Sequence, residues 1–337
     1  MLLGVAPMDG ISDAIFRIIT KEVFEKYGKD EDELVLWTEF MNVHGYAINP
    51  NKVIRHIVHT EYEKPLVAQL YGADEAYLLK SFCEVEQKYG KGFAGLELNM
   101  GCPARKVVDS GCGVGMLRER EKSLDLVKKL SESLSLPFSI KTRTGLTEVD
   151  KKEQLDYLVE LSKYCCMITV HSRTFSEGYA GDPSWEFIYD LKTKILKQGN
   201  AACKVIGNGG IKSYEDCKLR LGNLDGVMIG QAAIGNPRVF TSHLPSLQEK
   251  KEVVLRHLEL LAKFEVYVKQ NIYPFAGDIF PFPSLELLEN ISLEDTKNYA
   301  DVYFSVIEFR KFLFNYVKGI EGNKEFKIAI AQNYGKY

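Results

Sequence analysis

The sequence predicts an α/β protein, a (β/α)8 TIM barrel followed by a small C-terminal helical domain. Eight apolar runs of strand length occupy the first two-thirds of the chain, amphipathic stretches separate them, and strand signals stop after about residue 240. Strand–helix units joined by right-handed crossovers close into a barrel when there are eight of them. An open doubly wound sheet is the alternative, but the near-regular units and the lack of an early G-x-G-x-x-G favour the barrel.

The expected strands are mostly continuous apolar runs, which is typical of parallel strands buried on both faces. In chain order they cover residues 2–7, 34–40, 65–70, 95–100, 138–142, 167–172, 203–208 and 226–230. A barrel of parallel strands places all their carboxyl ends at one rim, so the residues that follow each strand are expected to meet there.

Amphipathic stretches between the strands predict the helices. Ser12 and Asp13 can cap a helix that runs to Tyr27, where Gly28 fits the stop. Further helices are expected over residues 73–89, 121–134, 150–164 and 182–197, and beyond the barrel over 248–270, 293–318 and from about Asn323. We therefore expect two domains, a barrel of residues 1–243 and a helical domain of residues 244–337.

The expected helical domain carries an aromatic stripe and a cationic end. The stripe is expected to pack in the core rather than to stack on bases; it consists of Tyr303, Phe304, Phe309, Phe312, Phe314 and Tyr316. From Arg310 to the end there are six basic and two acidic residues. A solvated helix face is the simpler interpretation of this excess, and a contact with nucleic acid is the alternative.

The composition is that of a soluble globular protein. Of 337 residues, 45% are hydrophobic and 26% charged, and the formal net charge is −3. These values exclude a disordered or collagen-like chain and a supercharged nucleic-acid clamp. Seven cysteines without a C-x-x-C pair predict neither a disulfide framework nor a zinc site, and the histidines lack ligand spacing, so we expect no metal and a reducing cytoplasm. We expect no signal peptide and no membrane association.

Polar or cationic residues close nearly every expected strand. Burying so many polar groups at one rim is costly unless they face a ligand, and barrel enzymes build their sites there. The glycine-rich loops after the seventh and eighth strands predict a phosphate site, because their exposed N–H groups can hold an anion. The candidate residues at the strand ends are Pro7, Met8, Asp9, Thr38, Glu39, Gln69, Asn99, Cys102, Lys141, Arg143, His171, Arg173, Asn208, Gly209, Gly210, Gly230 and Gln231.

Three of these side chains allow a chemical interpretation. The Lys141 ammonium can offset negative charge on a reduced ring system, although a salt-bridged lysine would look the same in sequence. His171 fits a neutral hydrogen-bonding imidazole as well as an acid or base. Cys102 stands between glycine and proline, in a loop, and without an adjacent histidine it fits a proton donor better than a nucleophile. Cys112 is the alternative candidate for the proton donor.

At this point the motifs resemble those of the bacterial-type tRNA-dihydrouridine synthases. The matching segments are Pro7-Met8-Asp9-Gly10, Thr38-Glu39, Gln69, Asn99-Met100-Gly101-Cys102-Pro103, Lys141-Thr142-Arg143-Thr144-Gly145, His171-Ser172-Arg173-Thr174 and Asn208-Gly209-Gly210. The N-M-G-C-P and H-x-R-T segments together are the most specific part. The resemblance covers the barrel throughout, and the helical tail agrees more weakly.

The resemblance implies an FMN-dependent barrel enzyme that reduces the 5,6 double bond of particular uridines in tRNA, with NADPH as electron donor. Expected to bind FMN are Pro7, Met8, Asp9, Gln69, Lys141, His171, Asn208, Gly209, Gly210, Gly230 and Gln231. Expected to hold the uracil and its phosphate are Asn99, Arg143 and Arg173. Cys102 is the expected catalytic acid, which protonates C5 while C6 receives hydride from the flavin. The partner is tRNA, and a monomer is expected.

Two features depart from this pattern. The family usually has arginine after the last glycine, where this chain has Gln231, and losing that charge weakens FMN binding by about 1 kcal/mol or more. The net charge of −3 is unusual for an RNA-binding protein, so the cations must be local. Candidates are the basic end after Arg310 and the rim residues Arg105, Lys106, Arg143 and Arg173.

Two other functions fit parts of the sequence. An FMN barrel acting on a free small molecule, such as a dihydroorotate-dehydrogenase-like enzyme or an ene-reductase, explains the rim but not the helical tail. A non-catalytic barrel that binds RNA or a protein partner explains neither Cys102 nor the glycine-rich loops. The resemblance does not say which uridine is modified.

Overall fold

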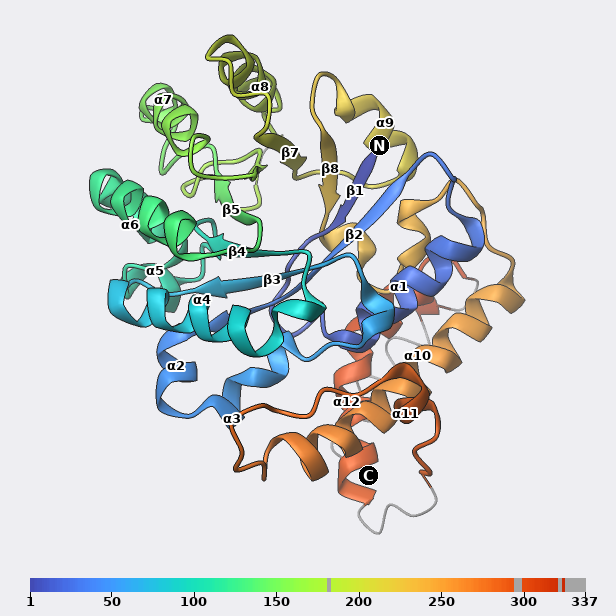
Figure 1. Cartoon of the computed structure of the whole chain (residues 1–337). Helices are drawn as coiled ribbons and strands as arrows, with labels where there is room; N and C mark the ends of the chain where they lie inside the picture. The colour runs from blue at the N-terminus through green and yellow to red at the C-terminus, as the bar shows by residue number, and fades with distance from the viewer. Residues whose placement is uncertain (181–182, 294–298, 321–322, 325–337) are drawn as a thin grey trace.

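The computed structural model describes residues 1–180, 183–293, 299–320 and 323–324, with only the backbone for residues 299–306. Eight parallel strands form a closed barrel in chain order, with β8 beside β1 (Figure 1). They are β1 (Leu2–Val5), β2 (Glu33–Asn42), β3 (Leu66–Tyr71), β4 (Gly95–Asn99), β5 (Phe138–Arg143), β6 (Met167–His171), β7 (Lys204–Asn208) and β8 (Gly226–Ile229). The barrel predicted from the sequence is therefore confirmed, and the open sheet was the wrong alternative.

Helices cover the outside of the barrel (Figure 1). Those predicted are α1 (Ala14–Tyr27), α4 (Glu75–Tyr89), α6 (Arg120–Ser133), α7 (Lys151–Leu161) and α8 (Glu186–Lys197), each within a few residues of its expected bounds. Four short helices were not predicted from the sequence: α2 (Val43–Ile48), α3 (Pro50–Val53), α5 (Arg105–Asp109) and α9 (Tyr214–Leu221). These helices have between four and eight residues, too few for an apolar period to show.

The first helix shows how local sequence sets its ends. The Asp13 carboxylate accepts a hydrogen bond from the backbone N–H of Phe16 at 2.8 Å, as an N-cap does. Gly28 ends the helix as predicted, but its φ is −69°, so positive φ is not the reason. A Cβ there would lie 2.6 Å from the backbone oxygen of Phe24, so glycine is needed for space.

The tail is helical, as predicted. It contains α10 (Leu247–Tyr267), a π-helical turn (Val268–Ile272), α11 (Leu285–Glu289) and α12 (Tyr299–Tyr316). From the aromatic stripe, Phe309, Phe312 and Tyr316 are buried, which agrees with a packing role, whereas the side chains of Tyr303 and Phe304 lie outside the description. The short helix expected from Asn323 falls almost wholly in residues 325–337, outside the described part of the chain.

The tail packs against the barrel beside α1 (Figure 1). Phe312 on α12 stacks on Phe16 of α1 with ring centroids 5.7 Å apart. Gly235, in the loop after β8, has a φ of +61°, and a Cβ there would lie 2.1 Å from the backbone oxygen of Phe312. The tail thereby reaches the carboxyl end of the barrel, next to the expected site. Among the described residues, none of the helices has the length and apolar content that crossing a bilayer requires.

The barrel interior is not uniformly apolar. An apolar cluster fills part of it and consists of Ala6, Val35, Trp37, Val67, Met167, Ile206 and Met228. Beside this cluster, β3 and β4 contribute the buried polar side chains Gln69, Glu97 and Asn99. Because buried polar groups are costly without partners, these side chains need a reason in the neighbouring site.

Candidate active site

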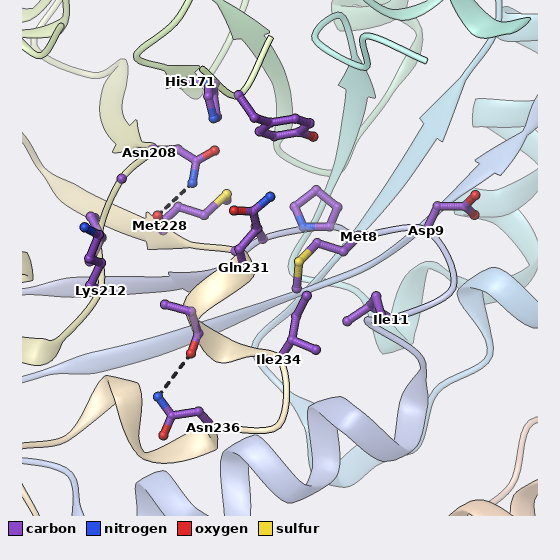
Figure 2. A pocket seen from close by; sticks show the side chains of 18 of the residues that line it. Met8, Asp9, Ile11, His171, Asn208, Lys212, Met228, Gln231, Ile234 and Asn236 are labelled. Atoms are coloured by element: carbon purple, nitrogen blue, oxygen red, sulfur yellow. Dashed lines mark hydrogen bonds between the residues drawn. The ribbon is translucent and has the colours of Figure 1, made fainter. Parts of the chain in front are cut away.

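A cavity of about 1260 Å³ opens at the carboxyl ends of the strands (Figure 2). Its wall comes from the loops after β1, β4, β5, β6, β7 and β8 and from the tail helices α10 and α12. The residues predicted for binding or catalysis that line it are Pro7, Met8, Asp9, Asn99, Cys102, Lys141, Arg143, His171, Arg173, Asn208, Gly209, Gly210, Gly230 and Gln231. Gln69 is the exception, because its side chain is fully buried beneath the wall.

Cys102 is held in a turn that its own sequence specifies. The side-chain oxygen of Asn99 accepts hydrogen bonds from the backbone N–H groups of Gly101 at 3.0 Å and Cys102 at 2.9 Å. This is how an asparagine side chain stabilises a tight turn two and three residues ahead of it. A Cβ at Gly101 would lie 3.1 Å from the backbone carbon of Thr142, so the glycine lets the turn rest against β5. The thiol is thereby fixed in the cavity wall.

The structure separates the two candidate thiols. Cys102 lines the cavity and is partly exposed, whereas Cys112 is buried and absent from the wall. Burial is the main cause that raises the pKa of Cys102; Asp9 adds to it, and Lys141 opposes it. A thiol with a raised pKa is protonated at neutral pH, so Cys102 suits proton donation and not attack as a thiolate.

Lys141 places a positive charge in the cavity wall. Its ammonium makes no hydrogen bond or ion pair with any residue that the structure describes. Burial lowers the pKa of Lys141, and the nearby Glu97 opposes that change. The salt-bridged lysine considered from the sequence is therefore not what is found, and a cation left without a partner in a cavity favours an anionic or electron-rich ligand.

His171 is a neutral hydrogen-bonding group. Burial, and then the positive charges of Arg143 and Lys141, lower its pKa to about 2. It therefore carries no proton to donate as an imidazolium at neutral pH. Its Nδ1 is buried without a partner in the described residues, and Figure 2 shows the ring directed into the cavity. Of the two roles open from the sequence, the structure favours the neutral imidazole.

The loop after β7 forms an anion cradle. Gly209 and Gly210 have φ values of +115° and +75°, and a Cβ would lie 2.5 Å from Ser172 Oγ at the first and 2.4 Å from Pro183 Cγ at the second. Neither of their backbone N–H groups donates to a described residue. Free N–H groups in a turn of this kind bind phosphate. The Asn208 side chain donates to the backbone oxygen of Met228 at 2.8 Å, which fixes this loop to β8 (Figure 2).

Gln231 stands where the resembling family usually has arginine. It opens a single 3-10 turn (Gln231–Ala233), is exposed, and points into the cavity in Figure 2. The position is therefore correct for a ligand contact, but the side chain brings an amide and no charge.

Arg143 lines the cavity, yet its described hydrogen bonds go to the backbone. Its guanidinium donates to the carbonyl oxygens of Gly101 at 2.9 Å, Thr174 at 3.1 Å and Gly178 at 2.9 Å. It ties the Cys102 turn to the loop after β6. Substrate contact by Arg143 stays a prediction. The structure shows in addition that its guanidinium holds two loops of the site together.

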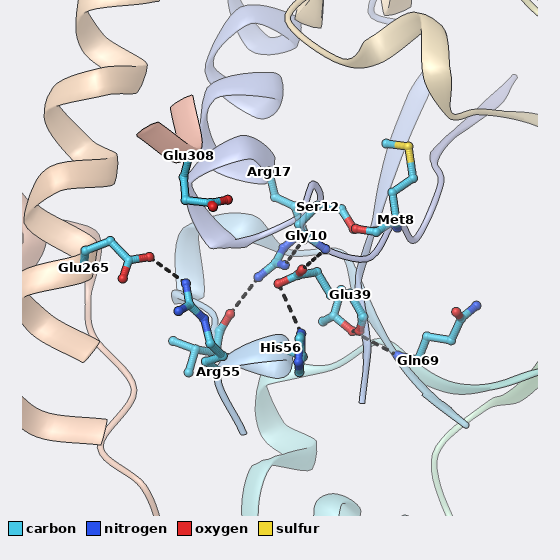
Figure 3. A network of polar contacts seen from close by, with 12 residues as sticks. Met8, Gly10, Ser12, Arg17, Glu39, Arg55, His56, Gln69, Glu265 and Glu308 are labelled. Carbon is cyan, nitrogen blue, oxygen red and sulfur yellow. Dashed lines mark hydrogen bonds and ion pairs between the residues drawn. The ribbon is translucent and has the colours of Figure 1, made fainter. Parts of the chain in front are cut away.

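Asp9 lies away from the cavity centre (Figure 2). Asp9, Glu39 and His56 each bring one possible metal-ligand atom within 4.8 Å of the others. Glu39 is already engaged, since it accepts a hydrogen bond from Gly10 N–H at 2.5 Å and lies 3.5 Å from His56 Nδ1 (Figure 3). The sequence could not show this group, because its members come from three separate segments: the loop after β1, strand β2 and the 3-10 turn at Ile54–Ile57. We assign no metal to it.

Two residues of this region were not singled out from the sequence. Tyr179 is 61% exposed and lines the cavity, with its ring edge-to-face on His171 at 6.1 Å and Arg143 over it at 5.5 Å. The exposed aromatic a few residues beyond the H-x-R-T segment is the signal that could have found it. Glu97, fully buried on β4, is the other.

Comparisons with known proteins match the chain to one family. Residues 4–277 match the model described as dihydrouridine synthase (Dus). The chain is 30% identical over 280 residues to the probable tRNA-dihydrouridine synthase 2 of Bacillus subtilis (strain 168), with 80% of each chain covered. It is 28% identical over 275 residues to tRNA-dihydrouridine synthase B of Pasteurella multocida (strain Pm70), with 77% of each covered. Among solved structures, QR15, an aldolase, aligns with a TM-score of 0.41 and 12% identity, over 68% of this chain and 89% of that chain.

Proposed function

Because the chain belongs to the dihydrouridine synthase family, we propose that it reduces the 5,6 double bond of specific uridines in tRNA. Family membership confirms the resemblance predicted from the strand-end motifs. One observation of the structure carries the proposal further. A protonated thiol at Cys102, the ammonium of Lys141 and the backbone N–H groups of Gly209 and Gly210 all face one cavity, and neither the ammonium nor the N–H groups have a partner among the residues that the structure describes.

The cavity wall fits FMN. The N–H groups of Gly209 and Gly210 suit its phosphate, and Lys141 and the His171 Nδ1 suit the polar edge of its ring system, because none of these groups is bonded within the described part of the chain. Pro7, Met8 and Gly230 would lie along the cofactor, with Gln231 near the phosphate. When bound, FMN supplies hydride that originates from NADPH. Gln69 would act from beneath, through Asn99.

The chain's own residues supply the rest of the chemistry. Cys102 holds the proton that C5 of the uracil receives, and its raised pKa keeps that proton in place until it is needed. Lys141 stabilises negative charge next to the reacting ring. Arg173 would hold the uracil or its phosphate, and Asn99 can contribute only the second hydrogen of its Nδ2, since the first goes to Gln69 and its Oδ1 serves the Cys102 turn. A uridine must leave the stack to enter such a cavity, and the exposed Tyr179 ring at the wall offers a surface on which it can stack.

The tail helices take part in the proposed tRNA site. Lys250 on α10 and Lys318 beyond α12 line the same cavity as Arg105 and Lys212 from the barrel. None of the four forms an ion pair with a described residue, so their charges are available to phosphates. We therefore assign tRNA binding to residues 244–337 together with the barrel rim, and we expect a monomer to be sufficient.

The function is tested by mapping dihydrouridine in tRNA from cells with and without the gene. The proposal expects particular positions to lose the modification and to regain it when unmodified tRNA is incubated with purified protein, FMN and NADPH. Yellow protein that oxidises NADPH with small enoate or orotate-like compounds, and leaves tRNA unchanged, would instead support the small-molecule alternative. Colourless protein that binds tRNA without reducing it would support the non-catalytic alternative.

The glycine cradle gives a prediction about the cofactor. Gly210→Ala places a methyl group 2.4 Å from Pro183 Cγ at a φ of +75°, so the loop must move. We expect the dissociation constant for FMN to rise by about 10-fold or more, since left-handed strain alone costs about 1–2 kcal/mol. Titration of the apoprotein with FMN, followed by flavin fluorescence, measures it. Gly90→Ala, at a helical φ of −55°, is the control and should leave binding unchanged.

The cationic rim gives a prediction about tRNA. Lys250→Ala with Lys318→Ala should weaken tRNA binding severalfold and lower the slope of log affinity against log salt by about one per lysine. Filter binding at several salt concentrations measures both. Lys128→Ala with Lys204→Ala removes the same charge from exposed positions outside the cavity and is the control. Equal losses in the two double variants would mean that the tail does not contact RNA.

A further inference from the structure

A carboxylate lies inside the barrel beneath the cavity. Glu97 on β4 is fully buried, as is Gln69 on β3, and neither lines the cavity wall. Burial raises the pKa of Glu97, and the hydrogen bond from Gln69 and the charge of Lys141 act against this. Burying a carboxyl group costs folding free energy unless hydrogen bonds compensate for the lost solvation. Because Glu97 does not line the cavity, direct contact with a ligand does not account for its burial.

Hydrogen bonds lead from Glu97 to the catalytic turn without a break. Gln69 Nε2 donates to Glu97 Oε1 at 2.6 Å, and Asn99 Nδ2 donates to Gln69 Oε1 at 2.8 Å. Asn99 Oδ1 is then left to accept from the N–H groups of Gly101 at 3.0 Å and Cys102 at 2.9 Å. Three side chains from two neighbouring strands thus connect the barrel interior to the thiol that lines the cavity.

The Glu97 carboxylate determines the direction in which this series of hydrogen bonds runs. A primary amide can turn over and exchange its oxygen with its nitrogen, so two amides in series have two self-consistent arrangements. In its ionised form Glu97 accepts and does not donate, which directs the nitrogen of Gln69 toward Glu97 and its oxygen toward Asn99. The Asn99 oxygen must then face the turn. In the reverse arrangement the Asn99 nitrogen would face two N–H groups, and the turn would lose both of its bonds.

We propose that Glu97 is a positioning residue that, through Gln69 and Asn99, sets the amide orientation on which the Cys102 turn depends. The role in catalysis rests on the proposed function, since Cys102 acts as the acid there. The proposal about the turn is independent of the reaction. Glu97 also lies close enough to Lys141 to act on its charge, since Lys141 is on the adjacent strand β5, opposite Asn99 and two residues beyond the Glu97 register. Its negative charge favours the charged form of that ammonium.

Two substitutions separate orientation from charge. Glu97→Leu removes the acceptor, so the two amides are free to turn over. Glu97→Gln removes the charge but retains an amide oxygen that can accept from Gln69. Ser139→Ala is the matched control, because its hydroxyl lies 3.4 Å from the other oxygen of the same carboxylate and has no part in the chain of amides.

The first readout is the reactivity of the Cys102 thiol, which does not require turnover. Purified protein is treated with iodoacetamide and alkylation is followed peptide by peptide, with the partly exposed Cys83 as internal reference, since Glu97 is not among the groups that shift its pKa. We expect Cys102 to react severalfold faster relative to Cys83 in Glu97→Leu, since the turn has lost its bonds. Glu97→Gln and Ser139→Ala should react at the wild-type rate. A merely structural role would change both thiols or neither.

The second readout compares the effect of each variant on kcat with its effect on KM for tRNA. Glu97→Leu should lower kcat by about 10- to 100-fold with little change in KM for tRNA, since a small misplacement of a catalytic group has effects of that size. Glu97→Gln should recover most of this loss. If Glu97→Leu does not fold, Gln69→Met is the second variant. It interrupts the same series of hydrogen bonds while Glu97 is retained, and it should reproduce the faster alkylation of Cys102.

Wild-type alkylation of Cys102 in folded Glu97→Leu, or in Gln69→Met when the first variant does not fold, would overturn the proposal. If the wild-type protein does not reduce tRNA, the proposed function fails, but the alkylation comparison still decides whether Glu97 orients the turn.

Discussion

Replacing Cys102 with alanine should lower dihydrouridine formation by about 10²- to 10⁴-fold while FMN remains bound, the usual effect of losing a general acid. The thiol lines the cavity, its pKa is raised by burial, and the turn is held through backbone N–H groups that alanine retains. The loss should therefore appear in kcat and not in the fold. Single-turnover reduction of unmodified tRNA measures the rate, and flavin absorbance measures cofactor content.

Cys112→Ala is the control for this experiment. That thiol is buried outside the cavity wall, with its sulfur 3.4 Å from Ser110 Oγ, so turnover should stay near the wild-type rate. Should Cys102→Ala reduce tRNA normally, the proton must come from another group, and the assignment of the acid would be wrong. Loss of flavin together with activity would instead mean that the turn itself had collapsed.

The second large effect concerns stability. Arg17→Met should lower the free energy of unfolding by about 3–5 kcal/mol, because it leaves a buried carboxylate without its partner. Arg17 and Glu63 are both fully buried, with Arg17 Nε 2.6 Å from Glu63 Oε2. The guanidinium also donates to the carbonyl oxygens of Ser12 at 2.5 Å and Val58 at 2.7 Å (Figure 3). Urea denaturation measures the change.

The pH dependence of this loss has a definite sign. Burial already raises the pKa of Glu63 above its ordinary value, and removing Arg17 raises it further. A carboxyl whose pKa is higher in the folded than in the unfolded state makes stability fall as pH rises. The variant should therefore lose more stability at neutral than at mildly acidic pH.

Two further variants complete the stability test. Lys26→Met, on the exposed face of the same helix, should change stability by less than about 0.5 kcal/mol. Arg17→Met combined with Glu63→Met should recover part of the loss, since no charge is then left buried. If the double variant were as unstable as Arg17→Met alone, the two carbonyl contacts, and not the ion pair, would account for the effect.

The fold was predictable because strands that are buried on both faces of a sheet appear in the sequence as continuous apolar runs. Runs such as that of β8 (Gly226–Ile229) are apolar from end to end, so strand positions and their number could be found without tertiary information. The short α9 was missed because eight residues carry few periodic positions. Gly28 shows a subtler limit: its position as a helix stop was predictable, but the crowding by Phe24 that requires it was not.

The site was predictable where the rule of strand ends applies, and not where contacts cross the barrel. That rule found Lys141 and His171, but the sequence could not show that one is unpaired and the other neutral, since both facts depend on neighbours from other strands. Glu97 was within reach, because it lies two residues before Asn99 and alternation puts both on the inner face. Tyr179 left only a weak signal, an aromatic residue shortly after the H-x-R-T segment, since a loop brings it back to the cavity.

The contact of Gly235 with the Phe312 carbonyl has a consequence for protein engineering. Two backbones touch there, so neither segment can be exchanged on its own. A chimaera designed to retarget the enzyme would need to take α12 and the loop after β8 from the same parent protein. Otherwise the two backbones would not pack against each other at Gly235.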